Sequence, residues 1–166
     1  IIHCPAHNAH AVAELVVGLM ICETRNVARA NYALKQGEWR ENYPNSGRIR
    51  ELRSSSVGII GFGTIGRLVV DLLQPFHTTI YVNDPFVDEK EIKEAGCIPV
   101  SKEDLLKEAD IVTLHGRIGP NDPPIIGAPE LALMKPTSYL INTARAVLVD
   151  MDALVHSLEI HQIMGA

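Results

Sequence analysis

The 166-residue sequence has little of what marks several classes of protein. Its net charge is −5, and its densest basic stretch, residues 48–53, is short and includes Glu51. Nucleic acids and anionic membranes attract clustered lysine and arginine, so neither is an expected partner. The longest apolar run, residues 11–22, is interrupted by Glu14 and is shorter than the about 20 residues that a membrane-spanning helix needs.

Cysteine is also scarce, and its spacing is typical of neither a metal site nor a disulfide framework. The three cysteines are Cys4, Cys22 and Cys97. An odd number of free thiols indicates a reducing compartment. The first residues show neither a basic start nor a long apolar stretch, so no signal peptide is expected. We therefore expect a soluble, cytoplasmic protein.

The sequence shows no arrangement of Ser, His and Asp or of Cys and His that is typical of a catalytic nucleophile. His3, His7 and His10 lie close together, but only His7 and His10 could share one face of a helix. A loop between domains explains them better than a metal site does, and we expect no metal.

One long helix is predicted over residues 8–38, because Asn8 is a good N-cap, no proline follows and Gly37 ends the pattern. The first half of this segment is apolar on almost every side, and such a helix must be covered on every side. We therefore expect a second domain or a second subunit against it. The alternative is a central helix within a single core.

After a polar, turn-rich loop at 40–56, short apolar runs alternate with amphipathic stretches through residues 57–166. The expected strands are 57–60, 79–82, 98–100, 111–114 and 139–141. The expected helices are 64–74, 87–95, 102–108, 128–134 and 150–158. Strands and helices that alternate at this spacing predict an α/β fold, a doubly wound parallel sheet with helices on both faces.

The segment 61–66, G-F-G-T-I-G, has the spacing G-x-G-x-x-G between a predicted strand and a predicted helix. In such loops the first glycine, Gly61, allows a tight turn, and the second, Gly63, lets the backbone approach a diphosphate. The third, Gly66, lets the helix pack closely on the strand. The free N–H groups at the helix start then bind the diphosphate.

Asp84 closes the next predicted strand, close to the usual interval of about 20 residues after the glycines. A carboxylate at this place accepts hydrogen bonds from the adenosine ribose and repels a 2′-phosphate. The sequence thus predicts a Rossmann-like domain that binds NAD rather than NADP. A glycine turn with an unrelated aspartate is the alternative.

The segment 136–150, P-T-S-Y-L-I-N-T-A-R-A-V-L-V-D, resembles the signature around the substrate-binding arginine of the D-isomer-specific 2-hydroxyacid dehydrogenase family. Residues 5–14 and 34–39 resemble the start and the end of that family's long interdomain helix. Residues 109–115 resemble its strand beside the nicotinamide ribose. The resemblance therefore covers nearly the whole chain, and its four motifs stand in the family's order.

This resemblance implies a two-domain enzyme with its active site in a cleft. It identifies residues 1–166 as the NAD-binding domain, with 8–38 as an interdomain helix and 57–166 as the Rossmann-like core. The substrate domain is expected outside this sequence. The implied partners are a small 2-hydroxy or 2-oxo acid and a second copy of the chain, bound through the 8–38 region.

By motif match, Arg145 is the catalytic arginine, which binds the substrate carboxylate, polarises the carbonyl and lies at the cofactor. Its planar fork of donors suits the two coplanar acceptors of a 2-oxo acid. The family does not place its proton donor at the position of His115, so His115 is not expected to be catalytic. The other implied cofactor contacts are Thr64, Ile65, His115, and Thr143 and Ala144 through their backbone.

Two features depart from the family pattern. Ala6 and Ala146 stand where many members have glycine, and a positive φ at either would add strain of about 1 kcal/mol. The family's catalytic carboxylate, its catalytic histidine and a cofactor-contacting aspartate are all expected beyond residue 166. The 166-residue chain is therefore expected to bind cofactor without catalysing turnover.

Three alternatives stay open. The chain could belong to a non-catalytic, NAD(H)-responsive module similar to a corepressor, or to an oxidoreductase similar to formate dehydrogenase. It could also belong to an NAD-dependent hydrolase of the adenosylhomocysteine type, although the N-T-A-R segment at 142–145 argues against this. A downstream Glu and His would favour an enzyme over a binding module.

Overall fold

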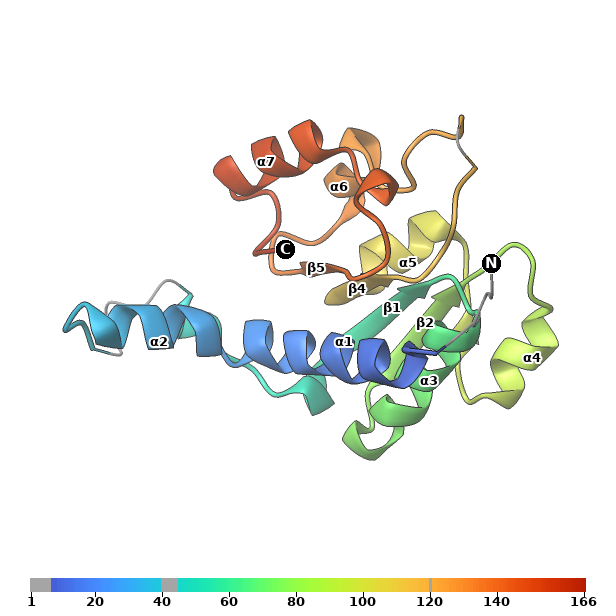
Figure 1. The fold of residues 1–166 in the computed structure, drawn as a ribbon, viewed down its shortest axis with the longest axis horizontal. Coiled ribbons are helices and arrows are strands. Elements are labelled where there is room, and N and C mark those ends of the chain that lie inside the picture. Colours follow the sequence, from blue (N-terminus) through green and yellow to red (C-terminus); the bar gives the residue numbers. More distant parts are fainter. Residues whose placement is uncertain (1–6, 40–44, 120) are drawn as a thin grey trace.

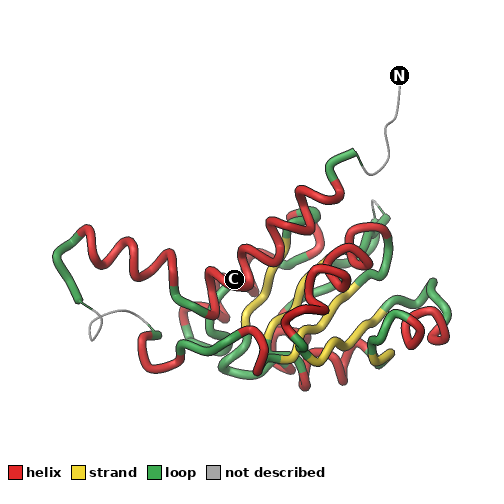
Figure 2. Tube along the Cα trace, turned by 90° about the horizontal axis from the view of Figure 1, so that it is seen from below, coloured by secondary structure: helices red, strands yellow, loops and turns green. Residues whose placement is uncertain are grey.

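A computed structural model of the chain describes residues 7–39, 45–119 and 121–166. Within them, parallel strands form a five-stranded sheet in the order β3-β2-β1-β4-β5. Helices cover both of its faces (Figures 1 and 2). The strands are Ser56–Ile60 (β1), Thr79–Asn83 (β2), Ile98–Pro99 (β3), Ile111–Leu114 (β4) and Tyr139–Asn142 (β5). The helices are Ala9–Thr24 (α1), Val27–Lys35 (α2), Thr64–Leu73 (α3), Glu89–Glu94 (α4), Lys102–Glu108 (α5), Ala128–Leu133 (α6) and Met151–Glu159 (α7).

The predicted α/β fold with a doubly wound parallel sheet is confirmed, and each strand bound lies within one residue of its predicted position. A strand buried on both faces is apolar along nearly its whole length, which made β1 and β4 easy to find in the sequence. The predictions about His3, Cys4 and Ala6 lie outside the described residues. In the described part of the chain, no helix is both long enough and apolar enough to span a membrane.

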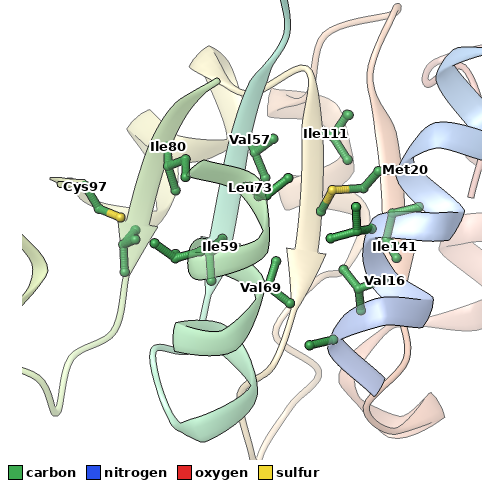
Figure 3. Packing of buried hydrophobic residues seen from close by; sticks show 14 of the residues in the cluster. Val16, Met20, Val57, Ile59, Val69, Leu73, Ile80, Cys97, Ile111 and Ile141 are labelled. Atoms are coloured by element: carbon green, nitrogen blue, oxygen red, sulfur yellow. The ribbon is translucent and has the colours of Figure 1, made fainter. Parts of the chain in front are cut away.

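Alternate residues of β1, β2, β4 and β5 pack into separate cores on the two faces of the sheet. On one face, Val57 and Ile59 of β1 belong to one core with buried residues of α1 and α3, among them Met20 and Leu73 (Figure 3). On the other face, the buried side chains come from β4, β5, α5, α6 and the segment before α7: Val112, Leu114, Leu140, Leu105, Leu131 and Leu148. Both faces of the sheet are therefore covered by helices. Loops can gather at the edge formed by the carboxyl ends of the strands.

The segment expected to be one helix over residues 8–38 is two helices, α1 and α2. Asn26, between them, has φ +60°, a left-handed conformation that cannot continue an α-helix. Asparagine adopts this conformation more readily than most residues other than glycine, so the chain can break there without proline or glycine. Beyond the break, α2 projects away from the sheet (Figure 1).

The apolar half of this segment is expected to be covered on every side, and the domain itself covers only one side, so cover by a second domain or a second subunit stays a prediction. Ala13, Val16 and Met20 are fully buried against the protein's own sheet and α3. On the opposite side of α1, Leu15 is 53% exposed. The domain itself therefore covers one face of α1, and the other face remains accessible.

Candidate functional site

The predicted site residues lie at the carboxyl ends of four neighbouring strands, in loops and in the first turn of α3. The glycine loop follows β1, Asp84 follows β2, His115 follows β4, and the segment 143–145 follows β5. Strand β1 pairs with both β2 and β4, so the chain runs to opposite sides of β1 in the two halves of the sheet. Such a switch point is where open parallel sheets bind ligands.

The glycine loop turns in a space that admits no side chain at two of its glycines. Gly61 has φ +98°, and a Cβ there would lie 2.5 Å from the backbone nitrogen of Gly116. A Cβ on Gly66 would lie 2.4 Å from the carbonyl oxygen of Gly61. The predicted tight turn at Gly61 is therefore present. Gly66 was expected to let α3 pack closely on the strand, but its closest approach is to the turn at Gly61.

The N-terminus of α3 faces open space and has no side-chain cap. Gly63 occupies the N-cap position, and a Cβ on it would meet nothing within 4 Å. By contrast, α4 and α7 begin with the capping carboxylates of Asp88 and Asp150. The first N–H groups of α3, at Thr64 and Ile65, thus remain available for an anion.

The Asp84 carboxylate is held in place by backbone donors. The backbone N–H of Phe62 donates to its Oδ2 at 2.6 Å, and that of Phe86 donates to its Oδ1 at 2.9 Å. A carboxylate offers about four acceptor positions, so acceptor capacity remains for ribose hydroxyls. Asp84 therefore fixes both the glycine loop and its own loop, a link that the sequence motif alone did not reveal.

Arg67, in α3, is a further residue beside the glycine loop that the sequence reasoning missed. Its guanidinium carbon lies 4.4 Å from the centroid of the buried Phe62 ring, and its Nη2 lies 2.8 Å from Oε2 of Glu91. The cation thus packs on the glycine loop and links α3 to α4. An arginine directly after the last glycine was the available signal.

His115 lies against the glycine loop and is neutral at ordinary pH. Its backbone N–H donates to the carbonyl of Ile60 at 2.8 Å, and its Nε2 lies 3.1 Å from Oγ1 of Thr113. Burial lowers the pKa of His115 to about 4. At pH 7 only about one molecule in a thousand would carry the proton, which makes His115 a poor general acid.

The segment after β5 presents Thr143 and Arg145 at the same edge of the sheet. Thr143 Oγ1 is buried and has no hydrogen-bond partner among the described residues. Arg145 is exposed, and its Nη1 donates to the carbonyl of Ala144 at 2.7 Å. Ala146 begins a 3₁₀ turn and is not among the residues with positive φ, so the strain considered for this alanine does not arise.

Not every hollow in the molecule belongs to this site. The space between Arg48, Arg50, Thr137, Tyr139 and Met164 lies where β5 begins, at the opposite edge of the sheet. None of the predicted site residues lines it.

The residues present fit a dinucleotide on structural grounds. The open face of Gly63 and the uncapped start of α3 can receive a diphosphate, and Asp84 is placed for an adjacent ribose. At the other end, a bound ligand could complete the hydrogen bonding of the Thr143 hydroxyl, which is buried without a partner among the described residues.

Comparison with known families finds a match over residues 17–166 to the model described as "D-isomer specific 2-hydroxyacid dehydrogenase, NAD binding domain". Among curated proteins, D-3-phosphoglycerate dehydrogenase of Methanocaldococcus jannaschii is 35% identical over 100% of this chain and 31% of its own length. The chain spans about a third to a half of the length of the curated relatives it matches.

Two solved structures are similar over nearly the whole chain. The D-isomer specific 2-hydroxyacid dehydrogenase of Lactobacillus delbrueckii ssp. bulgaricus, in its NAD-complexed form, has a TM-score of 0.87 and 30% identity, covering 98% of this chain and 49% of the other. The NAD-dependent formate dehydrogenase of Staphylococcus aureus, in complex with NAD, has a TM-score of 0.86 and 34% identity, covering 96% and 48%.

Proposed function

Because this chain belongs to the D-isomer-specific 2-hydroxyacid dehydrogenase family, as its NAD-binding domain, we propose that the protein transfers hydride between NAD(H) and a small D-2-hydroxy or 2-oxo acid. The cofactor of the domain is NAD. The observation that carries the proposal is the position of Arg145. It is exposed at the same sheet edge as the glycine loop and Asp84, where a substrate could meet the reactive end of a bound cofactor.

In this proposal the glycine loop and Asp84 hold the adenosine half of the cofactor. The diphosphate lies against Gly63, Thr64 and Ile65 at the start of α3, and the ribose hydroxyls donate to Asp84. The nicotinamide half lies towards His115 and the segment 143–145. When bound, NAD carries the hydride that is exchanged with the acid.

Arg145 binds the carboxylate of the acid and polarises its carbonyl oxygen. Its guanidinium presents parallel N–H donors that match coplanar acceptors. A proton donor is also required, and His115 does not fit because burial holds its pKa at about 4. We place the proton donor outside these 166 residues, so that the isolated chain binds NADH without turning over a 2-oxo acid.

The test uses the full-length protein and follows NADH absorbance with glyoxylate, pyruvate, hydroxypyruvate and, in the oxidative direction, D-3-phosphoglycerate. Arg145→Ala should lower kcat/KM by about 100-fold or more while leaving NADH affinity within about twofold. Arg53→Ala, which removes an exposed arginine before β1, is the matched control and should behave as the parent protein. An Arg145→Ala variant with undiminished turnover would contradict the proposed role.

Cofactor choice is tested at Asp84. We expect NADH to bind more tightly than NADPH, and Asp84→Ser should narrow the difference by about tenfold, or about 1.4 kcal/mol. Calorimetry that finds NADPH binding equal to or tighter than NADH binding in the unmodified protein would refute this role.

The same assays separate the alternative functions. Formate oxidation in place of 2-oxo acid reduction would favour the formate dehydrogenase alternative. NADH binding without any turnover in the full-length protein would favour the corepressor-like alternative.

We also propose that the protein is a homodimer formed through residues 8–38. Tyr32 and Trp39 are 68% and 66% exposed, Val27 and Leu15 are about half exposed, and α2 buries only Ala33. These exposed apolar side chains lie on α1, on α2 and just after α2, and a second copy could cover them. Free thiols at the described cysteines, Cys22 and Cys97, support a cytoplasmic location.

The dimer is tested by sedimentation of the full-length protein and of Tyr32→Glu. The variant should dissociate to monomers at concentrations where the parent remains dimeric. The dimer would bury the new carboxylate at position 32 in an aromatic interface, and this burial costs free energy. Ile160→Glu, at a residue that is 55% exposed just after α7, is the control and should stay dimeric. A monomeric parent at high concentration would exclude the dimer.

A further inference from the structure

Asn142, the last residue of β5, uses both ends of its side-chain amide to hold the turn that carries Arg145. Its Oδ1 accepts the backbone N–H of Ala144 at 3.1 Å. Its Nδ2 donates to the backbone carbonyl of Arg145 at 2.9 Å. The main chain of Asn142 is itself anchored in the sheet, where it pairs with Leu114 of β4. The side chain therefore connects a fixed strand to the next three residues.

The backbone of Arg145 is held from the other side as well. The N–H of Leu148 donates to the same Arg145 carbonyl at 3.2 Å, closing the 3₁₀ turn Ala146–Leu148. The carbonyl of Leu148 in turn accepts from the N–H of Ile126 at 3.1 Å. The guanidinium has no such support, since its one hydrogen bond among the described residues is to Ala144. The hydrogen bonds of the Arg145 main chain therefore determine the point from which its side chain extends.

We infer that Asn142 is a positioning residue, whose amide fixes the main chain of Arg145 and thereby the direction from which the guanidinium reaches the substrate. This inference rests on the proposed function of Arg145. Only a side chain with one donor and one acceptor at this length makes both bonds. Aspartate keeps the shape and the acceptor but loses the donor, and it places a carboxylate oxygen against the Arg145 carbonyl.

The experiment measures steady-state kinetics of the full-length protein with glyoxylate, pyruvate and hydroxypyruvate, together with NADH affinity by calorimetry. Asn142→Ala and Asn142→Asp should each lower kcat/KM for the 2-oxo acid by about 10- to 100-fold, because small displacements of a catalytic group have effects of this size. NADH affinity should stay within about twofold. Gln74→Ala is the matched control, since it removes an amide-to-carbonyl bond, to Ala95, just beyond the far end of α3.

A double-mutant cycle separates positioning from other roles. If Asn142 acts through Arg145, then Asn142→Ala should have almost no further effect on kcat/KM in an Arg145→Ala background. A purely structural defect, or a direct contact of Asn142 with substrate, predicts losses that multiply, and either result would overturn the inference. An NADH affinity within about twofold of the parent protein, in both Asn142 variants, checks that a loss of turnover is not a failure to fold.

The inference and the proposed function fail in different ways. If Arg145→Ala itself leaves turnover intact, the proposed role of Arg145 is wrong. If Arg145→Ala abolishes turnover while both Asn142 variants match the parent protein, the role of Arg145 stands and the positioning role of Asn142 is refuted.

Discussion

Protonation of His115 should make the protein less stable in mild acid. Its backbone lies against the glycine loop and its side chain is half-buried, and burial lowers its pKa to about 4, whereas an exposed histidine has a pKa of 6.5. The folded protein therefore keeps His115 neutral in a pH range in which the unfolded chain protonates it. Protons taken up by the unfolded state alone favour unfolding.

The direction and size follow from these two pKa values. Well above pH 6.5 the His115 ring is neutral in both the folded and the unfolded state. In that range His115 contributes nothing to the pH dependence of stability. As the pH falls from 6.5 to 4, the unfolded state gains stability, and the free energy of unfolding drops by about 3 kcal/mol in total. Between pH 7.5 and pH 4.5 the expected loss from His115 is about 2.5 kcal/mol.

Urea denaturation followed by circular dichroism at these two pH values measures the effect. Carboxylates also titrate in this range, so the quantity of interest is the difference between the parent protein and His115→Gln. The variant should lose about 2.5 kcal/mol less than the parent on acidification. His156→Gln, at an exposed histidine of α7, should lose as much as the parent.

Two results would refute this reasoning. One is an equal loss of stability in the parent and in His115→Gln. The other is an NMR titration in which the His115 ring of the folded protein protonates near pH 6.5. The second result would also reopen His115 as a candidate proton donor, because a ring with that pKa would be partly protonated at pH 7.

The remaining predictions concern packing. Gly66→Ala would place a Cβ 2.4 Å from the Gly61 carbonyl oxygen, so we expect a loss of about 1–3 kcal/mol in stability and at least about tenfold in NADH affinity. Gly18→Ala, in open space on α1, should be neutral or stabilising by up to about 1 kcal/mol; thermal melting and calorimetry compare the two. Burial and the nearby Asp71 raise the pKa of Cys97 to about 11, so its thiol should react with iodoacetamide at pH 8 only after unfolding, as peptide mapping would show.

The parts of this molecule that were predictable from sequence depend on local patterns. The apolar runs of β1 and β4 and the glycine spacing of the loop between β1 and α3 each repeat a physical requirement within a few residues. Asp84 was placed correctly after β2 because the apolar run that predicts this strand ends just before it. These features need no knowledge of what lies across the molecule.

The break at Asn26 and the amide bonds of Asn142 were not predicted, and the reason is the same for both. Asparagine occurs at helix caps, in turns and at strand ends, and its two functional groups have no preferred partner until the backbone around them is in place. Asn26 adopts φ +60° and is buried, so tertiary packing decided against a continuous helix. For Asn142, the partners are two and three residues later in a turn whose path depends on Leu148.

The two halves of the proposed cofactor site differ in how far the protein satisfies its own polar groups. In the adenosine half, Asp84 already accepts from the N–H groups of Phe62 and Phe86, so the carboxylate is held before any ligand binds. In the nicotinamide half, the Thr143 hydroxyl is buried without a partner among the described residues, which costs about 1–3 kcal/mol. The exposed Arg145 guanidinium can also give up its hydrogen bond to the Ala144 carbonyl. In our proposal, the first half therefore captures the cofactor on a rigid surface. Cofactor and substrate then complete the second half, so that part of the binding energy is used to assemble the reacting groups.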